Sequence, residues 1–467
     1  MLEKLFSLKE AGTTVRTEVT AGLAVFLTMS YIIFLQPAIL SGAFSGTDTG
    51  MDYGSVLTAT CIAAALATMI MALYARYPIA QAPGMGENFF FVFSVIPAAA
   101  GLAKVQSGQS EAWQIALGAV FISGVLFLLL SVLGVRKKLM DSISPSMKCG
   151  IAVGIGLFIA LLGLQYAGLV SSVPGAALTM NTDFNSPDIW VFFFGLVLTV
   201  ALMARKVPGA IFWGILGAAA FTLLLHGVLS RDSYSGARIF TAFHPAEKVV
   251  SAPPAVSPTF FRMDVAGALN LTMLPFIVVL LVMDVFDTMG TLVGVGTRAG
   301  FIKNNEMPRL ERAMLSDAVG TVAGAVLGTS TVTSFIESTV GVEEGGRTGL
   351  TAVTVALLFL CALFFAPVFA MVGSYPPITA PALVVVGAMM LQNVRELKWN
   401  DPSETIPAFL VMAGIPFTCS IGDGLALGFI GYPAIKLASG KGKEAGWFSY
   451  LMAILLTVYF VLVRNAV

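Results

Sequence analysis

Long apolar stretches constrain this chain more than any other feature of its sequence. A helix that crosses a membrane needs roughly 20 mainly apolar residues, and such segments recur from one end to the other. They fall near 18–41, 54–75, 79–101, 111–135, 144–168, 187–204, 207–229, 265–296, 311–328, 330–346, 349–372, 377–394, 403–419 and 421–438. The stretch 446–464 either crosses the membrane as well or lies along its surface. The sequence therefore predicts an all-α polytopic membrane protein with about fourteen transmembrane segments.

The amino-acid composition is typical of a membrane protein. Of the 467 residues, 57% are hydrophobic and 11% are charged, whereas a soluble domain carries about 25% charged residues. The formal net charge is zero, which argues against a nucleic-acid partner. The four cysteines and two histidines show no disulfide, metal-ligand or catalytic spacing. We therefore expect no cofactor, no metal site and no enzymatic activity.

The distribution of Lys and Arg predicts the orientation. Basic residues recur in alternate loops, at Arg76, 136–138, 205–206, 298–312 and 395–398, and in the N-terminal segment. The opposite side carries Lys104 and the basic residues of the long 230–262 loop, whereas its short loops at 42–53, 169–186 and 373–377 carry none. The positive-inside rule then places the N-terminus in the cytoplasm and the 230–262 loop outside. We expect a multi-pass protein of the cell membrane.

Seven segments, a long loop and seven more segments suggest two halves. Because seven is odd, tandem halves would lie inverted relative to each other in the membrane, an architecture known from transporters. The third and tenth segments support this reading, because both are short, interrupted and acidic. The third contains AQAPGMGENFFF with Glu87, and the tenth contains TSTVTSFIESTVG with Glu337. Interrupted segments at matching positions are a sequence pointer to a binding site, although Pro and Gly are also common in ordinary membrane helices.

Glu337 lies in the most unusual stretch of the chain, 329–346. Hydroxyl residues and glycines surround this carboxylate, between a glycine-rich segment and an almost purely hydrocarbon one. Such a polar, irregular backbone cannot face lipid, so it must line a cavity or be walled by protein. An ionisable side chain at membrane depth is a functional-site hypothesis by default. Glu337 is the first candidate for a binding residue.

The eighth predicted segment carries two further acids. Asp284 and Asp287 lie three residues apart, on one face of an otherwise apolar helix. An Asp at the centre of a membrane helix costs roughly 2.5–3.5 kcal/mol on insertion scales, so something must offset that cost. The alternatives are an internal ion pair or interhelical hydrogen bond on one side, and a substrate or proton site on the other. For Asp287 we favour proton coupling.

The third predicted segment offers an amide and aromatic rings. Pro83 and Gly84 interrupt the helix, and Asn88 follows with both a donor and an acceptor, as a heterocycle edge requires. Phe89 could stack on a planar ring, although a run of Phe more often faces lipid or the core. The GxG here has no βαβ context, so it is no dinucleotide fingerprint.

Other polar residues receive smaller roles. Asp317 and Asp423 lie near predicted segment ends and are secondary candidates, and Lys148 either reaches the interface or pairs with a carboxylate. The VEEGGRTG run at 342–349 is interpreted as a cytoplasmic turn and hinge. Glycines at four-residue spacing, Gly320, Gly324 and Gly328, predict close helix packing.

Four blocks give the chain a family resemblance: APGMGENFFF, DVFDTMGTLVGVG, TSFIESTVGVEEGGRTGLTAV and PFTCSIGDGLALGFI. They resemble the adenine/guanine/hypoxanthine permeases, the azaguanine-permease-like branch of the nucleobase–cation symporter-2 superfamily. The resemblance implies proton-coupled uptake of purine bases by a fold of two inverted seven-segment repeats, with short β-strands in segments 3 and 10. It divides the chain into a core domain (1–135 and 265–373), a gate domain (136–229 and 374–467) and an extracellular loop (230–264).

The resemblance also carries residue roles. It implies that the substrate is held by Asp287 and Glu337 and by Asn88 beside Gly86. To these we add Phe89, Phe335 and Ser338 as candidate substrate contacts from the sequence itself. We assign proton coupling to Asp287, with Glu337, Glu87 and Asp284 as further candidates. The chain departs from the family at Glu87, where many members carry an aliphatic residue, and at Gln36, where many carry Asn before the proline.

Two other functions compete with this reading. A channel or an anion exchanger of the same general fold would favour a cationic residue near the midplane, whereas this chain places acids there. An intramembrane enzyme would need a metal cluster or a Ser–His arrangement. The sequence leaves open the preference for adenine or for guanine and hypoxanthine, the proton stoichiometry and the oligomeric state, for which relatives suggest a homodimer.

Overall fold

The structure is a computed structural model that describes residues 2–42, 48–133, 144–173, 176–181, 183–229, 234, 237–302 and 307–458. Within these ranges, eight helices are long and apolar enough to cross a membrane. The protein is therefore a mainly helical, multi-pass membrane protein. The predicted basic loop at 136–138 lies outside the described residues.

The first half of the chain contains α1 (Leu2–Phe6), α2 (Val15–Met29), α3 (Tyr31–Leu40), α4 (Tyr53–Ile70), the π-helix η1 (Met71–Ala75), β1 (Gln81–Pro83), α5 (Met85–Phe90), the π-helix η2 (Phe91–Val95), α6 (Ile96–Ala100), α7 (Ala103–Gln106), α8 (Ala112–Leu133), α10 (Pro145–Tyr166), β2 (Val170–Val173), β3 (Ala176–Met180), α11 (Pro187–Ala204) and α12 (Ala210–Val228). The predicted third segment, 79–101, is thus a strand followed by short helical pieces.

The second half contains α13 (Arg238–Thr241), α14 (Val265–Ala268), α15 (Leu274–Arg298), α16 (Leu310–Leu327), β4 (Val332–Ser334), α17 (Ser338–Glu343), α18 (Gly349–Ala362), η3 (Leu363–Phe365), α19 (Ala366–Gly373), η4 (Pro376–Ile378), α20 (Ala380–Met390), η5 (Leu391–Glu396), α21 (Pro402–Thr418), α22 (Ile421–Ala438), η6 (Gly442–Glu444) and α23 (Trp447–Val458). The predicted tenth segment, 330–346, is again a strand and a short helix. In the predicted stretch 446–464, α23 packs against α22, and residues beyond 458 lie outside the description.

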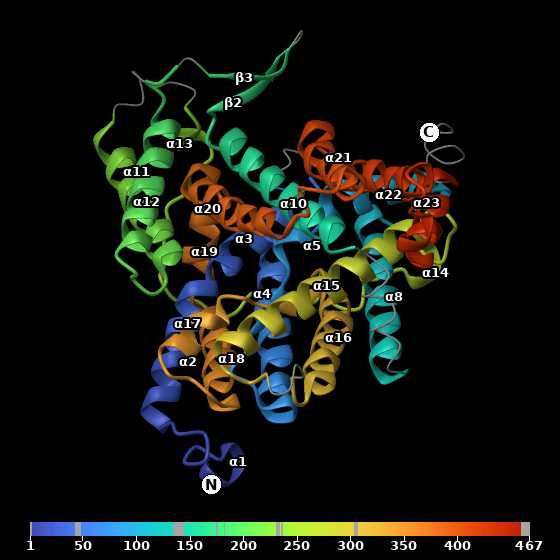
Figure 1. Cartoon of the computed structure of the whole chain (residues 1–467). Helices are drawn as coiled ribbons and strands as arrows, with labels where there is room; N and C mark the ends of the chain where they lie inside the picture. The colour runs from blue at the N-terminus through green and yellow to red at the C-terminus, as the bar shows by residue number, and fades with distance from the viewer. Residues whose placement is uncertain are drawn as a thin grey trace.

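The helices form two groups (Figure 1). In the lower part of the view, α2, α4, α16 and α18 pack together, and in the upper part α10 packs against α20 and α21 while α11 packs against α12. The long helix α15 passes between the two groups and contacts α8, α16 and α17. Both groups therefore meet near α15.

Glycines allow the helices of each group to approach closely. A Cβ on Gly154 would lie 3.0 Å from the Val411 carbonyl oxygen, and one on Gly163 would lie 2.9 Å from the Ala380 carbonyl oxygen. In the other group, a Cβ on Gly320 would lie 2.8 Å from the Ala67 Cβ. These contacts confirm the predicted packing role of the glycine-rich face of α16 at Gly320, and small residues at such crossings are typical of membrane helices.

The strands β1 and β4 join the two halves of the chain. They pair antiparallel, with Gln81 opposite Ser334 and Pro83 opposite Val332. The pairing continues at both ends, because the Gly84 N–H donates to the Thr331 carbonyl (3.0 Å) and the Phe335 N–H donates to the Ala80 carbonyl (3.0 Å). This pairing satisfies backbone groups at points where no helix does so, as irregular backbone inside a membrane protein requires.

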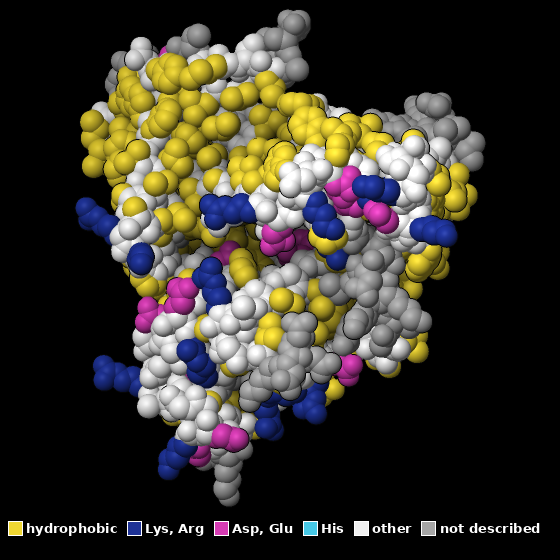
Figure 2. Space-filling model, in the orientation of Figure 1, with side chains coloured by type: hydrophobic (Ala, Val, Ile, Leu, Met, Phe, Trp, Pro, Cys, Tyr) yellow, Lys and Arg dark blue, Asp and Glu magenta, His cyan; other side chains and the backbone are white. Residues whose placement is uncertain are grey.

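Apolar side chains cover the outer surface of the upper group. Val197 on α11 is 66% exposed and Leu224 on α12 is 58% exposed, and Figure 2 shows a broad hydrophobic surface over these helices. Such a surface would be a liability in water, and it is the surface that lipid chains contact in a bilayer.

Candidate functional site

The candidate site lies at the paired strands β1 and β4, beside α15. Each strand leads into a short helix: β1 into α5, with Gly84 as the N-terminal cap residue, and β4 into α17, with Glu337 at the same position. The two halves thus bring the starts of two short helices to the same strand pair. Helix starts carry free N–H groups and a partial positive charge, so polar chemistry is concentrated at this strand pair.

Five carboxylates gather around the strand pair: Glu87 of α5, Asp284 and Asp287 of α15, Asp317 of α16 and Glu337. We call them the acidic cluster. Asp287 lies close enough to Glu87, Asp317 and Glu337 to interact with them electrostatically, and Asp317 lies close enough to Asp284 to do the same. The structure therefore brings together acids that are as far apart in sequence as 87 and 337.

Asp287 faces open space. Its side chain is exposed, as are Gly290 and Val293 further along the same face of α15. A Cβ placed on Gly290 would have no atom within 4 Å. Figure 2 shows a hollow near the middle of this face, between the two groups of helices, with acidic side chains inside it. The exposed face of α15 at Asp287 is therefore the side on which the acidic cluster is accessible.

Glu337 lies on the other wall of this space and has a defined partner. The Tyr31 hydroxyl donates a hydrogen bond to Glu337 Oε1 over 2.8 Å. Tyr31 is buried at the start of α3, directly after the break at Ser30 that separates α2 from α3. Glu337 itself is half-buried, and the neighbouring Ile336 is exposed. One carboxylate oxygen is thus held in place by the Tyr31 hydroxyl.

Asp284 is fully buried behind Asp287. Its Oδ2 accepts a hydrogen bond of 2.8 Å from the Thr321 hydroxyl, and its Oδ1 has no partner among the described residues. Thr321 also accepts from the Val332 N–H over 3.0 Å. Asp284 therefore contacts the strand pair through Thr321, in line with the interhelical hydrogen bond that the sequence left open for this acid.

Asp317 is buried in the interior of α16, rather than near a segment end as expected from the sequence. It accepts hydrogen bonds from Gln81 Nε2 over 2.6 Å and from the Ser334 hydroxyl over 3.1 Å. The Thr288 hydroxyl of α15 donates to its other oxygen. Asp317 thus links α15, α16, β1 and β4. Asp317 therefore holds the paired strands against α15 and α16 by hydrogen bonds.

The residues predicted in the third segment are more deeply placed than expected. Asn88 is buried, and its Oδ1 accepts from the Ser330 hydroxyl. Phe89 is buried against Phe93 and Phe158, at ring-centroid distances of 6.1 and 6.2 Å. Both side chains are therefore occupied within the protein in this structure.

The remaining predicted residues surround the strand pair. A Cβ on Gly86 would lie 3.4 Å from Ile155 of α10 and 3.9 Å from Met283 of α15, so α5 begins between these helices. The buried Ser338 hydroxyl accepts from the Ala80 N–H over 3.0 Å. Glu87 is buried over Gly84, and Phe335 is buried at the end of β4.

The polar partners of the acidic cluster are hydroxyls and an amide. The ion pairs found among the described residues lie elsewhere, at Lys104–Asp264, Arg238–Asp188, Arg298–Glu343, Lys436–Glu404, Lys436–Glu444 and Lys441–Asp401. Lys148 of α10 lies 4.6 Å above the ring of Phe286. A carboxylate away from water needs compensation, so these acids favour a proton or a ligand rich in N–H donors.

Sequence reasoning missed Tyr31 and Gln81. Tyr31 is an isolated phenol in an apolar segment, and Gln81 is a lone amide at the start of an interrupted one. Both are polar side chains that a membrane helix would not carry without a partner. That signal was present, but the identity of the partners depends on pairing between the two halves.

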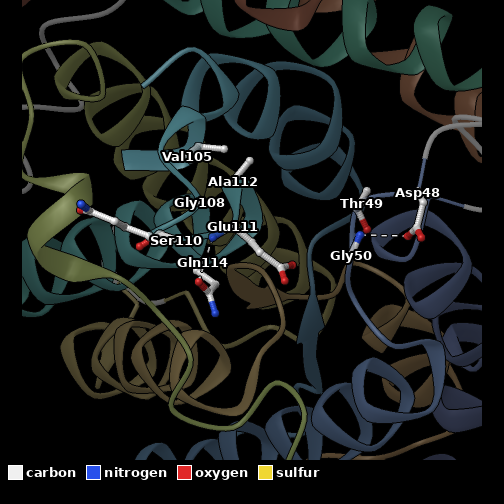
Figure 3. Close-up of a pocket in the computed structure, with 10 residues that line it drawn as sticks. Asp48, Thr49, Gly50, Val105, Gly108, Ser110, Glu111, Ala112 and Gln114 are labelled. Carbon is white, nitrogen blue, oxygen red and sulfur yellow. Dashed lines mark hydrogen bonds between the residues drawn. The ribbon is translucent and has the colours of Figure 1, made fainter. Parts of the chain in front are cut away.

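Two clefts of the described residues lie away from the acidic cluster. One, of about 560 Å³, lies between the 48–50 loop and the start of α8, as Figure 3 shows with Asp48 and Thr49 facing Glu111 and Gln114. The other, of about 540 Å³, lies between residues 244–248 and α19. Neither contains a residue predicted for the site.

Comparison with known proteins gives consistent results over nearly the whole chain. The model of the family Xan_ur_permease, described as a permease family, matches residues 16–426. A relative from Methanocaldococcus jannaschii, named only as a permease, is 43% identical over 461 residues, covering 98% of both chains. The guanine/hypoxanthine permease PbuO of Bacillus subtilis (strain 168) is 39% identical over 97% of this chain and 99% of its own length. The adenine permease AdeP of Escherichia coli (strain K12) is 37% identical over 99% and 96%.

The fold is also similar to that of solved transporters. The transmembrane domain of a cyanobacterium bicarbonate transporter, BicA, superposes with a TM-score of 0.60, covering 88% of this chain and 97% of that one. Sequence identity is 15%, so the similarity concerns the fold alone.

Proposed function

This chain belongs to the Xan_ur_permease family of permeases, and we propose that it is a symporter that imports purine nucleobases together with protons. The relatives named as guanine/hypoxanthine and adenine permeases support the substrate class. The preference between these bases is left to experiment. The protein is a transporter, not an enzyme.

The observation that carries the proposal is the acidic cluster on the exposed face of α15. Asp287 is exposed there, and half-buried Glu337 accepts a hydrogen bond from the Tyr31 hydroxyl. Purine bases are planar and carry ring N–H donors, which a carboxylate accepts in charge-assisted hydrogen bonds about twice as strong as neutral ones. A neutral base with several N–H groups therefore suits this site.

The two acids have different tasks in this proposal. Glu337, at the start of α17, accepts N–H groups of the base, and the Tyr31 hydroxyl holds it in position. Asp287 takes up and releases the proton that couples transport to the proton gradient. Buried Asp284 and the unusual Glu87 lie close enough to influence that proton electrostatically. Further substrate contacts in this proposal are Asn88, Gly86, Phe89, Phe335 and Ser338, which surround the strand pair.

Alternating access follows from the two groups of helices. The proposed core consists of 1–135 and 265–373, the proposed gate of 136–229 and 374–467, and 230–264 forms the loop between the halves. Fourteen segments in two inverted repeats are the arrangement we propose. In support, β1–α5 and β4–α17 repeat the same strand-then-helix order in the two halves. Movement of one group against the other would expose the acidic cluster to each side in turn.

An anion exchanger is the main alternative, because the similar fold of BicA belongs to a bicarbonate transporter. Five acids at the candidate site disfavour an anionic substrate, because like charges repel in a medium of low dielectric constant. We therefore place a neutral base ahead of bicarbonate or sulfate.

A competition experiment tests the proposal. Purified protein in liposomes is given labelled guanine or adenine with an inward proton gradient, and unlabelled adenine, guanine, hypoxanthine, xanthine and uracil are added in turn. We expect saturable uptake of at least one 6-substituted purine, inhibition by other purines and little inhibition by uracil. Uptake of bicarbonate or uracil with no competition from purines would contradict the proposal.

Location and assembly complete the proposal. The protein lies in the cell membrane with a cytoplasmic N-terminus, as the distribution of Lys and Arg predicts. Association into a homodimer stays a prediction from the resemblance, and the mass of the detergent-solubilised protein tests it.

A further inference from the structure

We propose that Glu18, in the first turn of α2, is a positioning residue for Glu337. It anchors the α2–α3 pair to the turn between α17 and α18, and this anchor sets Tyr31 at hydrogen-bond distance from Glu337. The inference rests on the proposed function, because it gives Glu337 a task in purine binding. It also assigns a role to the 342–349 run, which the proposed mechanism leaves unused.

Glu18 is a buried carboxylate whose described partners carry no opposite charge. It is 0% exposed, and it accepts hydrogen bonds from the N–H groups of Arg347 (2.9 Å), Thr348 (3.2 Å) and Thr351 (3.1 Å). The Thr351 hydroxyl donates a further bond of 2.6 Å. The Arg347 guanidinium instead donates to the Val342 and Gly346 carbonyls, over 2.5 and 2.8 Å. Glu18 therefore caps α18 from a different helix.

The chemistry of this cap requires an anion. The first N–H groups of a helix have no partner within it, and the positive end of the helix dipole favours a negative charge there. A Gln side chain at position 18 keeps one carbonyl oxygen but turns an NH2 group toward backbone N–H donors. Some of these donors would then lose their acceptor in a buried place, which is the costly case.

Glycines allow α2 to pack closely against this turn. A Cβ on Gly341 would lie 2.4 Å from a Val25 methyl and 3.1 Å from the Ala21 carbonyl oxygen, and one on Gly346 would lie 2.9 Å from the Ala21 Cβ. The contact between α2 and the 341–346 segment is therefore direct. The turn predicted from the sequence is thus an anchored element.

The junction between α2 and α3 reaches Glu337. Tyr31 follows Glu18 by thirteen residues, which is about 20 Å along a helix, and its hydroxyl meets Glu337 Oε1 at 2.8 Å. Glu337 directly precedes the six-residue helix α17, and the turn that follows α17 is the one held by Glu18. The α2–α3 pair thus holds α17 at both ends. Loss of the anchor would let this pair shift along α17, and the Tyr31–Glu337 bond would loosen.

A double-mutant cycle tests the proposal. Guanine and adenine are titrated against the full-length protein carrying Glu18→Gln, with Glu10→Gln as the matched control on the exposed N-terminal segment. We expect the affinity for the bound base to fall roughly threefold to tenfold for Glu18→Gln, because a charge-assisted bond is loosened rather than removed. The control should keep its affinity.

The second arm of the cycle separates positioning from general stability. In a Tyr31→Phe background the bond to Glu337 is already absent, so Glu18→Gln should change affinity by less than about twofold. An equal loss in both backgrounds would show that Glu18 does not act through Tyr31. Lower thermal stability with unchanged affinity would also overturn the proposal.

Two milder variants at Thr351 test the anchor if Glu18→Gln fails to fold. Thr351→Val removes only the hydroxyl donor to Glu18, whereas Thr351→Ser keeps it. We expect the Val variant to bind the base more weakly than the Ser variant, and equal affinities would contradict the anchor.

A readout without ligand distinguishes the two failures. Hydrogen exchange of the 338–348 amides should be faster in Glu18→Gln than in Glu10→Gln, whether or not a base is present. If the unmodified protein binds neither guanine nor adenine, the proposed function is wrong. If exchange is unchanged, the anchor is wrong.

Discussion

Replacing Glu337 by Gln removes a charge and preserves shape, so it isolates the electrostatic part of substrate binding. The Tyr31 hydroxyl donates to Glu337 Oε1 over 2.8 Å, and a Gln carbonyl oxygen can accept that same bond. The fold should therefore survive the change. What is lost is the charge that strengthens hydrogen bonds from the N–H groups of a purine.

The size of the loss follows from the strength of such bonds. A hydrogen bond to a charged group contributes about 1.5–3 kcal/mol, which corresponds to roughly a tenfold to hundredfold change in dissociation constant. We therefore expect Glu337→Gln to bind guanine or adenine about ten to a hundred times more weakly than the unmodified protein.

The assay is equilibrium binding of guanine and adenine in detergent, with the melting temperature recorded for each variant. Glu343→Gln is the matched control, because Glu343 lies on the same short helix α17, is 62% exposed and pairs only with exposed Arg298 among the described residues. The control should bind normally. If Glu337→Gln binds within about twofold of the unmodified protein, Glu337 carries no charge-assisted bond and the assignment is wrong.

Three further predictions concern the support of the site, the outer loop and the topology. Asp317→Asn should lower stability by about 1–3 kcal/mol, because a buried donor at Gln81, Ser334 or Thr288 loses its acceptor, while base affinity changes little; normal stability with lost binding would make Asp317 a ligand. Burial alone raises the pKa of the Asp264 carboxyl, but hydrogen bonds from the Gly267 N–H, Lys104 and Ser110 outweigh it and hold the pKa below its usual value. The ionised Asp264 carboxylate therefore stabilises the fold above its unfolded pKa of about 3.9, and this stabilisation is lost as the pH falls through the lower folded pKa. Hydrogen exchange of the 264–268 amides should therefore accelerate below about pH 4. Asp264→Asn should abolish this pH dependence. In a cysteine-free protein, an impermeant thiol reagent should label Glu247→Cys from outside and leave Arg312→Cys unlabelled, and the reverse pattern would invert the topology.

The sequence predicted the parts of the site that depend on local pattern. Glu337 and Glu87 stand out because hydroxyl, Pro and Gly residues interrupt their segments, and Asp284 and Asp287 stand out because a carboxylate in an apolar helix is costly. Their spacing of three residues correctly predicted a shared side of α15. Even so, one is buried and the other exposed, since the strand pair covers only part of that side.

The partners could not be predicted, because they come from the other half of the chain. Gln81 and Ser334 are 253 positions apart and meet only because β1 pairs with β4. Tyr31 and Glu337 are separated by 306 positions. No periodicity within a segment carries such information. The placement of Asp317 in the middle of the hydrogen-bond network was missed for the same reason.

Aromatic residues show a different limit. The sequence left Phe89 open between stacking on a planar base and packing in the core, and in the structure it packs against Phe93 and Phe158. A Phe side chain has no polar atom that would distinguish a cavity wall from a core. Its surroundings decide its role, and they are set by α10, which the local sequence does not reveal.

The central claim is that Asp287 couples proton movement to transport while Glu337 binds the base, and one paired measurement on Asp287→Asn tests it most directly. Guanine and adenine binding is measured in detergent, and uptake is measured in liposomes with an imposed proton gradient. We expect the variant to bind the base but no longer to accumulate it, and the pH dependence of transport to flatten. If Asp287→Asn still concentrates the base in response to the proton gradient, the claim is contradicted, and Glu337 or Glu87 must carry the proton.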